Sequence, residues 1–128
     1  MVKEEDDELP KTAQEFYHTW IDELVKLTPY PNADFLLEEG KYTNAVGHEA
    51  ENALVKSLSN EHRQVLIKIL TEERTAALHN MLAGLEWWCA CSPLKITYKG
   101  RGFQSHVHFH GDYIGRLQGD WPWPTEYD

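Results

Sequence analysis

An uninterrupted run without proline or glycine, from residue 61 to residue 83, constrains the fold more than any other stretch of the chain. Because no helix-breaking residue divides it, the run predicts one long helix, which can continue through Gly84 to Cys91. Ser59 or Asn60 can cap its first amides. Its apolar residues occupy more than one face, so we expect a central helix with neighbours on several sides. They are Val65, Leu66, Ile69, Leu70, Leu78, Met81, Leu82 and Leu85.

Shorter helices are predicted before this run. Thr12 can accept a hydrogen bond from the amide of Glu15, and Glu15 can return one, which is the capping box that begins a helix. Pro29 ends that helix because it lacks an amide donor and disfavours helical geometry in the residue before it. A short helix ending at Gly40 and a longer one over about residues 44–58 follow. The first helix has an apolar stripe and a side toward water, namely Phe16, Trp20, Leu24 and Leu27 against His18, Asp22, Glu23 and Lys26.

After Pro93 the hydrophobic period changes from helical to two, which is the spacing of a strand. Leu94, Ile96 and Tyr98 alternate with polar residues in "LKITYK", a second strand is predicted from about residue 103 to residue 110, and "YIGRLQ" predicts a third. Turns at "GRG" and "HGD" would join them. We therefore predict an α+β fold in which about four helices pack on one face of a C-terminal three-stranded antiparallel meander.

Composition sets the class of protein. The chain has 128 residues and a formal net charge of −9, from 21 acidic and 12 basic residues. We expect one domain over residues 12–128 after an acidic, flexible N-terminus over residues 1–11. The acidity repels phosphate backbones, so we expect a protein partner, favour a basic one, and expect no nucleic acid ligand. No stretch is apolar and long enough to cross a membrane and no secretory leader is evident, which predicts a cytoplasmic protein. Cys89 and Cys91 lie two residues apart, which predicts two buried, reduced thiols.

The sequence "HVHFH" places His106, His108 and His110 on one face of the second predicted strand. Two imidazoles at this spacing can converge on one zinc ion, and Asp112 could supply a carboxylate ligand. The first strand would, however, place cations such as Lys95 beside them, and its apolar face must cover the helices. We therefore favour imidazoles that point away from the core and bind no cofactor, with zinc binding as the alternative.

The same outward face allows a third interpretation, a surface that binds a partner. Tyr113 would lie beside the histidines, and Trp121 and Trp123 of "WPWP" could serve as amphipathic anchors.

Polar residues interrupt the long predicted helix in "TEERTAALHN", where Glu72, Glu73 and His79 are the candidate catalytic residues. Glu72 and His79 lie about 10.5 Å apart along a helix axis, so they cannot chelate one ion together. We favour a solvated stripe of Glu72, Glu73 and Arg74, with His79 bonded to neighbouring backbone; the alternative is that these residues meet the histidine strand and form a pocket. No nucleophile elbow, phosphate-binding glycine loop or metalloprotease motif is present, which counts against an enzyme.

The run "LTEERTAALHNML", together with "DYIGRLQGDWP", resembles a family of small uncharacterised bacterial proteins known only as a domain of unknown function. The resemblance covers roughly the second half of the chain and does not include the histidine row. It implies a bacterial source and no established activity. It also draws attention to Glu72, Glu73, Arg74, His79 and Asn80.

These observations predict a small acidic, non-enzymatic module that binds another protein, by analogy with immunity or antitoxin proteins. The alternative is a metal-binding protein or metal-dependent hydrolase that uses the histidine strand. The sequence sets no oligomeric state.

Overall fold

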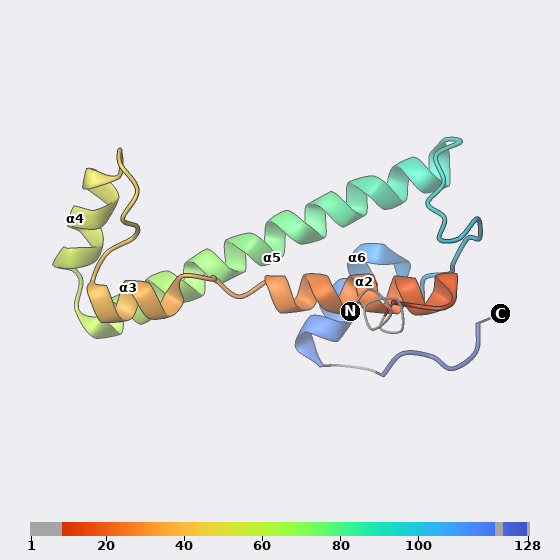
Figure 1. The fold of residues 1–128 in the computed structure, drawn as a ribbon, viewed down its shortest axis with the longest axis horizontal. Helices are drawn as coiled ribbons and strands as arrows, with labels where there is room; N and C mark the ends of the chain where they lie inside the picture. Colours follow the sequence, from red (N-terminus) through yellow and green to blue (C-terminus); the bar gives the residue numbers. More distant parts are fainter. Residues whose placement is uncertain (1–8, 120–121, 128) are drawn as a thin grey trace. The chain divides into compact units, whose positions relative to one another are not determined.

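The computed structural model describes residues 9–119 and 122–127. Within these residues the chain forms helices only (Figure 1), namely α2 (Ala13–Leu27), α3 (Ala33–Glu39), α4 (Glu49–Ser57), α5 (Asn60–Cys91) and α6 (His108–Gln118). The chain divides into two compact units. The first unit joins the residues up to Lys26 with those from Ala77 onward, and the second unit is Leu27–Ala76. Helix α5 contributes residues to both.

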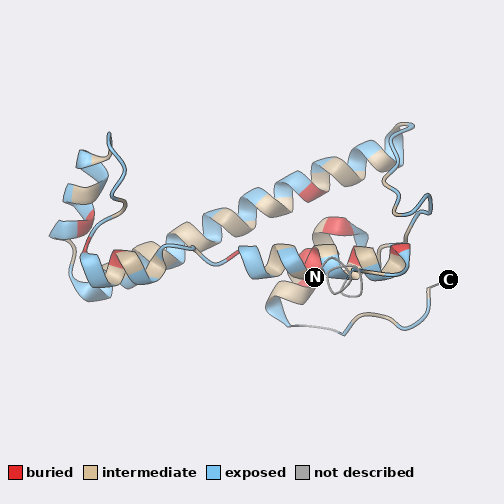
Figure 2. Ribbon diagram, in the orientation of Figure 1, coloured by how far each residue is buried: buried red, intermediate tan, exposed pale blue. Residues whose placement is uncertain are grey.

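The long predicted helix is confirmed as α5, which passes through Gly84 without a break. The hydroxyl of Ser59 accepts a hydrogen bond from the amide of His62 at 3.1 Å and so begins the helix as predicted. The expectation of a central helix is wrong, because among the residues of α5 Leu82 alone is buried. Figure 2 accordingly shows α5 as almost entirely half-buried or exposed. Leu78, Leu85 and Cys89 pack against the core as half-buried residues, whereas Val65, Ile69, Met81, Trp87 and Trp88 are exposed.

The predicted C-terminal meander is wrong. No strand occurs in the described residues, and the one bridge there joins Tyr98 and Arg101. Lys99 and Gly100 between them have φ values of 53° and 75°, so a tight turn does form, but it begins before the predicted "GRG" and has Lys99 and Gly100 at its centre. Pairing stops after that bridge. The α+β expectation is therefore replaced by an all-helical structure over the part of the chain that is described.

Helix α6 replaces the end of the second predicted strand and all of the third. Phe109 and Tyr113 are buried four residues apart and Leu117, four further on, packs against the same core, which is the period of a helix. Gly119 ends the helix in the left-handed conformation at φ 72°, and its amide donates to the carbonyl of Arg116 at 3.2 Å. The alternation in "HVHFH" is too short to compete with this longer pattern.

The core of the first unit lies where α2, α5 and α6 meet. Its buried residues are Tyr17, Ile21, Leu82, Phe109 and Tyr113. The ring of Tyr17 stacks on that of Phe103, with centroids 5.0 Å apart and planes 14° from parallel. Figure 2 shows the buried segments of α2 and α6. This cluster fixes the positions of the polar side chains described below.

The buried side of α2 differs from the predicted stripe. Tyr17 and Ile21 are fully buried, whereas Leu27 is 57% exposed. His18 and Asp22, predicted to face water, are half-buried. The predicted cap is confirmed, because the hydroxyl of Thr12 accepts the amide of Glu15 at 3.1 Å.

The second unit is built from a contiguous segment. Leu36 and Val55 are buried there. The guanidinium of Arg63 donates to the carbonyl of Val55 at 3.0 Å. The predicted glycine stop is confirmed at Gly40, which has φ 64° and ends α3. Helix α4 is shorter than the predicted 44–58. No helix in the described residues combines the length and the apolar composition needed to span a bilayer.

Candidate functional site

Asp112 on α6 is a fully buried carboxylate of the first unit with three hydrogen-bond donors around it. Its Oδ2 accepts the hydroxyl of Tyr17 at 2.5 Å and the amide of His106 at 2.8 Å. Its Oδ1 accepts the amide of Val107 at 2.8 Å. Burial, followed by the bond to Asp112, raises the pKa of Tyr17 far above its usual value, so the phenol stays protonated and donates. Asp112 therefore ties α2, α6 and the segment before α6 together.

The three histidines of "HVHFH" do not form the predicted row on a strand. His106 precedes α6, whereas His108 and His110 lie in its first turn. The rings of His108 and His110 stack with centroids 5.8 Å apart. His108 has φ 64°, an uncommon conformation for a residue with a side chain. The predicted alternation of the imidazoles on one face is therefore wrong.

Helix α5 adds two side chains to this pair. The ring of His79 meets that of His110 edge-on at a centroid distance of 5.2 Å. Nδ1 of His108 lies 2.9 Å from a carboxylate oxygen of Glu86. We call these four residues, His79, Glu86, His108 and His110, the histidine cluster. Nδ1 of His110 is buried and has no hydrogen-bond partner among the described residues. His79 and Glu86 lie seven residues apart, which places them on one side of the helix. That spacing is the sequence signal from which their position in one cluster could have been predicted.

The structure separates the predicted metal ligands. Asp112 is occupied by Tyr17 and two amides, while His108 and His110 remain together and His79 joins them. In the described residues no three His, Cys, Asp or Glu side chains are placed to hold an ion. The cluster in this form is a set of packed imidazoles with one carboxylate partner.

The candidate catalytic residues of α5 lie in different units. Glu72 and Glu73 are exposed in the second unit, where Glu72 lies 3.8 Å from the ammonium of Lys68. Arg74 donates to the carbonyl of Thr28 at 3.1 Å. His79 belongs to the first unit. Its Nδ1 lies 3.3 Å from the side-chain oxygen of Asn80, whereas the sequence predicted a hydrogen bond to neighbouring backbone. Glu72 and Arg74 thus have local partners that account for them.

The C-terminal segment packs on α2. Asp22 accepts a hydrogen bond from Nε of Arg116 at 2.9 Å and another from the indole N–H of Trp123 at 3.1 Å. The indole stacks on His18 at a centroid distance of 4.2 Å. Burial lowers the pKa of His18, and the charge of Asp22 opposes that shift. Two of the four side chains of α2 that were predicted to face water, His18 and Asp22, therefore hold the C-terminal segment.

These contacts change the predicted partner surface. Tyr113 is fully buried in the core, so it cannot contact a partner. Trp123 is half-buried against His18 and Arg116. Trp121 lies outside the described residues. The aromatic residues predicted for binding near the C-terminus thus serve, where described, to pack the first unit.

A different surface is exposed on α5, which we call the tryptophan stripe. Trp87 is 57% exposed, Trp88 55% and Met81 65%, and the two indoles meet edge-on at 5.1 Å. Spacings of three, four and seven residues place seven exposed residues on one side of the helix, away from Leu82. None of them is charged. They are Ala77, Asn80, Met81, Gly84, Trp87, Trp88 and Cys91.

The described residues around this stripe belong to a unit with balanced charges. The described residues of the first unit contain six acidic and six basic side chains, whereas the second unit contains eight acidic and five basic ones. The remaining excess of six negative charges comes from residues 1–8, 120 and 128. The described part of the first unit therefore carries no net charge and offers an uncharged contact surface on α5.

Comparison with known proteins gives a family and no activity. A model of a family of unknown function (DUF6547) matches residues 10–125. No curated protein and no solved structure matches the chain at a significant level. The match extends well beyond the second half of the chain, to which the resemblance found in the sequence was confined. The chain belongs to the family of unknown function DUF6547.

Proposed function

We propose that this protein binds another protein, without catalysis, through the tryptophan stripe of α5. The observation that carries the proposal is the exposure of Trp87, Trp88 and Met81 on one uncharged side of α5, where the two indoles touch. Contiguous exposed apolar surface on a folded protein marks interaction sites, and tryptophan is enriched among the residues that dominate binding energy. Such a face buries its apolar area only when a partner covers it.

The spacing of the stripe suits a helix of the partner. Ala77 and Gly84 lie seven residues apart, and a Cβ atom at Gly84 would meet nothing within 4 Å. A partner helix can therefore approach the backbone between the larger side chains of Met81 and Trp88, as in packing of helix ridges into grooves. The partner's contacting face should be apolar and uncharged.

The rest of the partner should be basic. Excess negative charge in the second unit and at both ends of the chain attracts a positive protein that comes within about a Debye length, which raises the rate of association at low salt. A cytoplasmic bacterial protein of the immunity or antitoxin type is the form of this function that we propose. Small size and acidity support it, and the free thiols of Cys89 and Cys91 suit a reducing compartment.

The double variant Trp87→Ser/Trp88→Ser should abolish partner binding. Tagged wild-type and variant chains are incubated with cytoplasmic extract at low salt, and retained proteins are compared by quantitative mass spectrometry. We expect a basic protein that the wild type retains and the variant loses. Titration calorimetry with that purified protein should then show a loss in affinity of roughly 700-fold, because each central tryptophan contributes about 2 kcal/mol and the variant removes both.

The matched control is Val46→Ser/Leu54→Ser, which removes two exposed apolar side chains of the second unit, 95% and 55% exposed. It should bind the partner as the wild type does. If both double variants lose the same proteins, or if every retained protein survives Trp87→Ser/Trp88→Ser, the stripe is not the binding surface. Sedimentation of the wild type alone shows whether a second copy covers the stripe instead, which would contradict a heterologous partner.

Metal binding is a second candidate function, favoured by the imidazoles of the histidine cluster and the unbonded Nδ1 of His110. An ion would have to draw the rings of His79, His108 and His110 together, with Glu86 as a carboxylate partner. A zinc titration should then give a Kd below about 1 μM that disappears in His108→Ala/His110→Ala and persists in His48→Ala/His62→Ala. Failure of the wild type to bind zinc in that range removes this candidate.

A further inference from the structure

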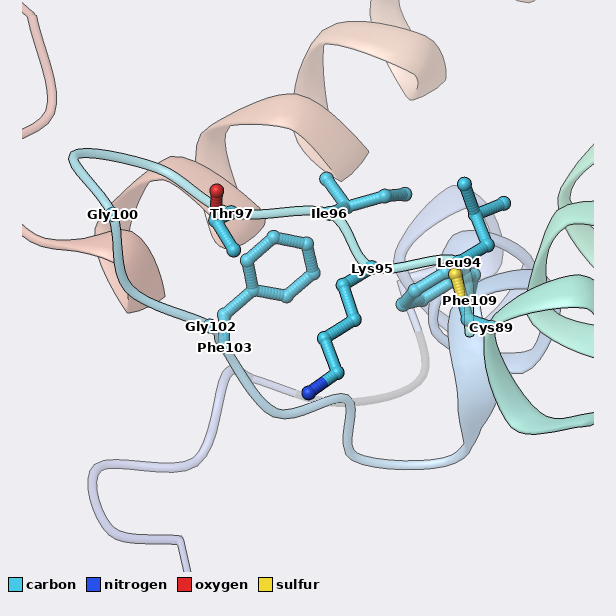
Figure 3. A pocket seen from close by; sticks show the side chains of 9 residues that line it. All are labelled: Cys89, Leu94, Lys95, Ile96, Thr97, Gly100, Gly102, Phe103 and Phe109. Carbon is cyan, nitrogen blue, oxygen red and sulfur yellow. The ribbon is translucent and has the colours of Figure 1, made fainter. Parts of the chain in front are cut away.

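A pocket of about 480 Å³ opens beside the C-terminal end of α5 in the first unit. Figure 3 shows its walls, which the segment 94–103 forms together with Cys89 of α5 and Phe109 of α6. The volume lies within the range of small-molecule sites. The pocket is independent of the tryptophan stripe, because Cys89 lines the pocket whereas Cys91 belongs to the stripe.

Apolar and polar groups share the walls about equally, and the apolar share comes from four large side chains. Leu94, Ile96, Phe103 and Phe109 surround the space, and Phe103 and Ile96 also pack against the core. Figure 3 shows the ring of Phe103 between Thr97 and Lys95. An apolar ligand would remove both its own surface and these side chains from water, which is the main favourable term in small-molecule binding.

One charged group accompanies this apolar lining. Lys95 is exposed, and the salt bridges among the described residues do not include it. No carboxylate lines the pocket. The thiol of Cys89 is held in its neutral form there, because burial and then the charge of Glu86 raise its pKa. The pocket therefore carries a single positive charge and no negative one.

We propose that this pocket binds a small monocarboxylate with an apolar body, such as a medium-chain fatty acid. The ammonium of Lys95 takes the carboxylate at the mouth, and the chain lies against Leu94, Ile96 and Phe103. A single lysine matches a single negative charge, whereas a phosphate would leave part of its charge unpaired. The lining holds no base, metal ligand set or activated nucleophile, so the site binds its ligand without converting it.

Titration calorimetry with octanoate tests the proposal. We expect binding with a Kd below about 1 mM, weakened roughly fivefold in Lys95→Met, because a partly exposed charge pair contributes about 1 kcal/mol. The neutral probe 1-octanol should bind the wild type roughly fivefold more weakly than octanoate and should not distinguish the wild type from Lys95→Met. The control Lys99→Met changes a lysine of the same segment that does not line the pocket, and it should leave the Kd of octanoate unchanged.

Alkylation of Cys89 tests the same site by a measurement that is independent of calorimetry. In a Cys91→Ser background Cys89 is the one remaining thiol. Saturating octanoate should slow its reaction with iodoacetamide, and Lys95→Met should restore the rate at the same octanoate concentration. The proposal is overturned if octanoate does not bind at millimolar concentration, if it binds without protecting Cys89, or if 1-octanol binds as tightly as octanoate. Since none of these readouts involves the partner or Trp87 and Trp88, this proposal can fail while the proposed function stands.

Discussion

Replacing Asp112 by alanine should destabilise the protein by about 3–5 kcal/mol, since three donors lose a buried acceptor together. The hydroxyl of Tyr17 and the amides of His106 and Val107 all point to this carboxylate. A buried donor left without a partner costs about 1–3 kcal/mol, and whole domains are stable by only about 5–15 kcal/mol. The measurement is urea unfolding followed by circular dichroism.

Two milder variants separate the contributions. Tyr17→Phe removes one donor and should cost about 1 kcal/mol, while Asp112→Asn keeps one carbonyl acceptor and should fall between Tyr17→Phe and Asp112→Ala. An Asp112→Ala protein that unfolds at the wild-type urea concentration would contradict the central structural role of this carboxylate. It would then have to be reconsidered as a functional group.

Leu82→Ala should cost about 2–5 kcal/mol, whereas Met81→Ala on the neighbouring position should change stability by less than about 0.5 kcal/mol. Leu82 is 3% exposed and belongs to the core, while Met81 is 65% exposed. Both substitutions shorten an apolar side chain to a methyl group within the same helix, so helix propensity changes little between them. Thermal unfolding of the two variants measures the difference directly.

The same pair distinguishes stability from binding. Met81→Ala should weaken association with the partner of the tryptophan stripe while the protein stays folded. Leu82→Ala should reduce stability without a specific effect on the stripe. Equal destabilisation by both variants would mean that Met81 is covered in solution and that α5 has a different buried side.

The helices before residue 92 could be predicted because each has its own local signals. Ser59 and Thr12 cap their helices, and Gly40 ends α3. The end of the second predicted strand and the third predicted strand both lie in α6. They could not be recognised as a helix from "HVHFH", because five alternating residues are too few to decide between the period of a strand and that of a helix. Gly119 after "YIGRLQ" was the signal that favours a helix. The error in the fold class came from that choice of period and from "LKITYK", whose alternation forms no strand beyond the bridge at Tyr98.

The candidate site was predictable in its residues but not in its arrangement. The histidines and Asp112 were identified, yet their roles depend on which element each enters. Once α6 is helical, Asp112 faces Tyr17, and His110 meets His79 from α5. The tryptophan stripe was visible as helical spacing, but a long apolar helix suggests burial. Its exposure depends on how few neighbours α5 has, which local sequence does not encode.

The two units differ in when a growing chain can complete them. Leu27–Ala76 is contiguous, so its contacts can form while the rest is still being synthesised. The bond between Tyr17 and Asp112 joins residues 95 positions apart, so the first unit must wait for almost the whole chain. Until α6 emerges from the ribosome, the apolar side of α2 has no cover, and this interval is when the nascent protein is most exposed to aggregation.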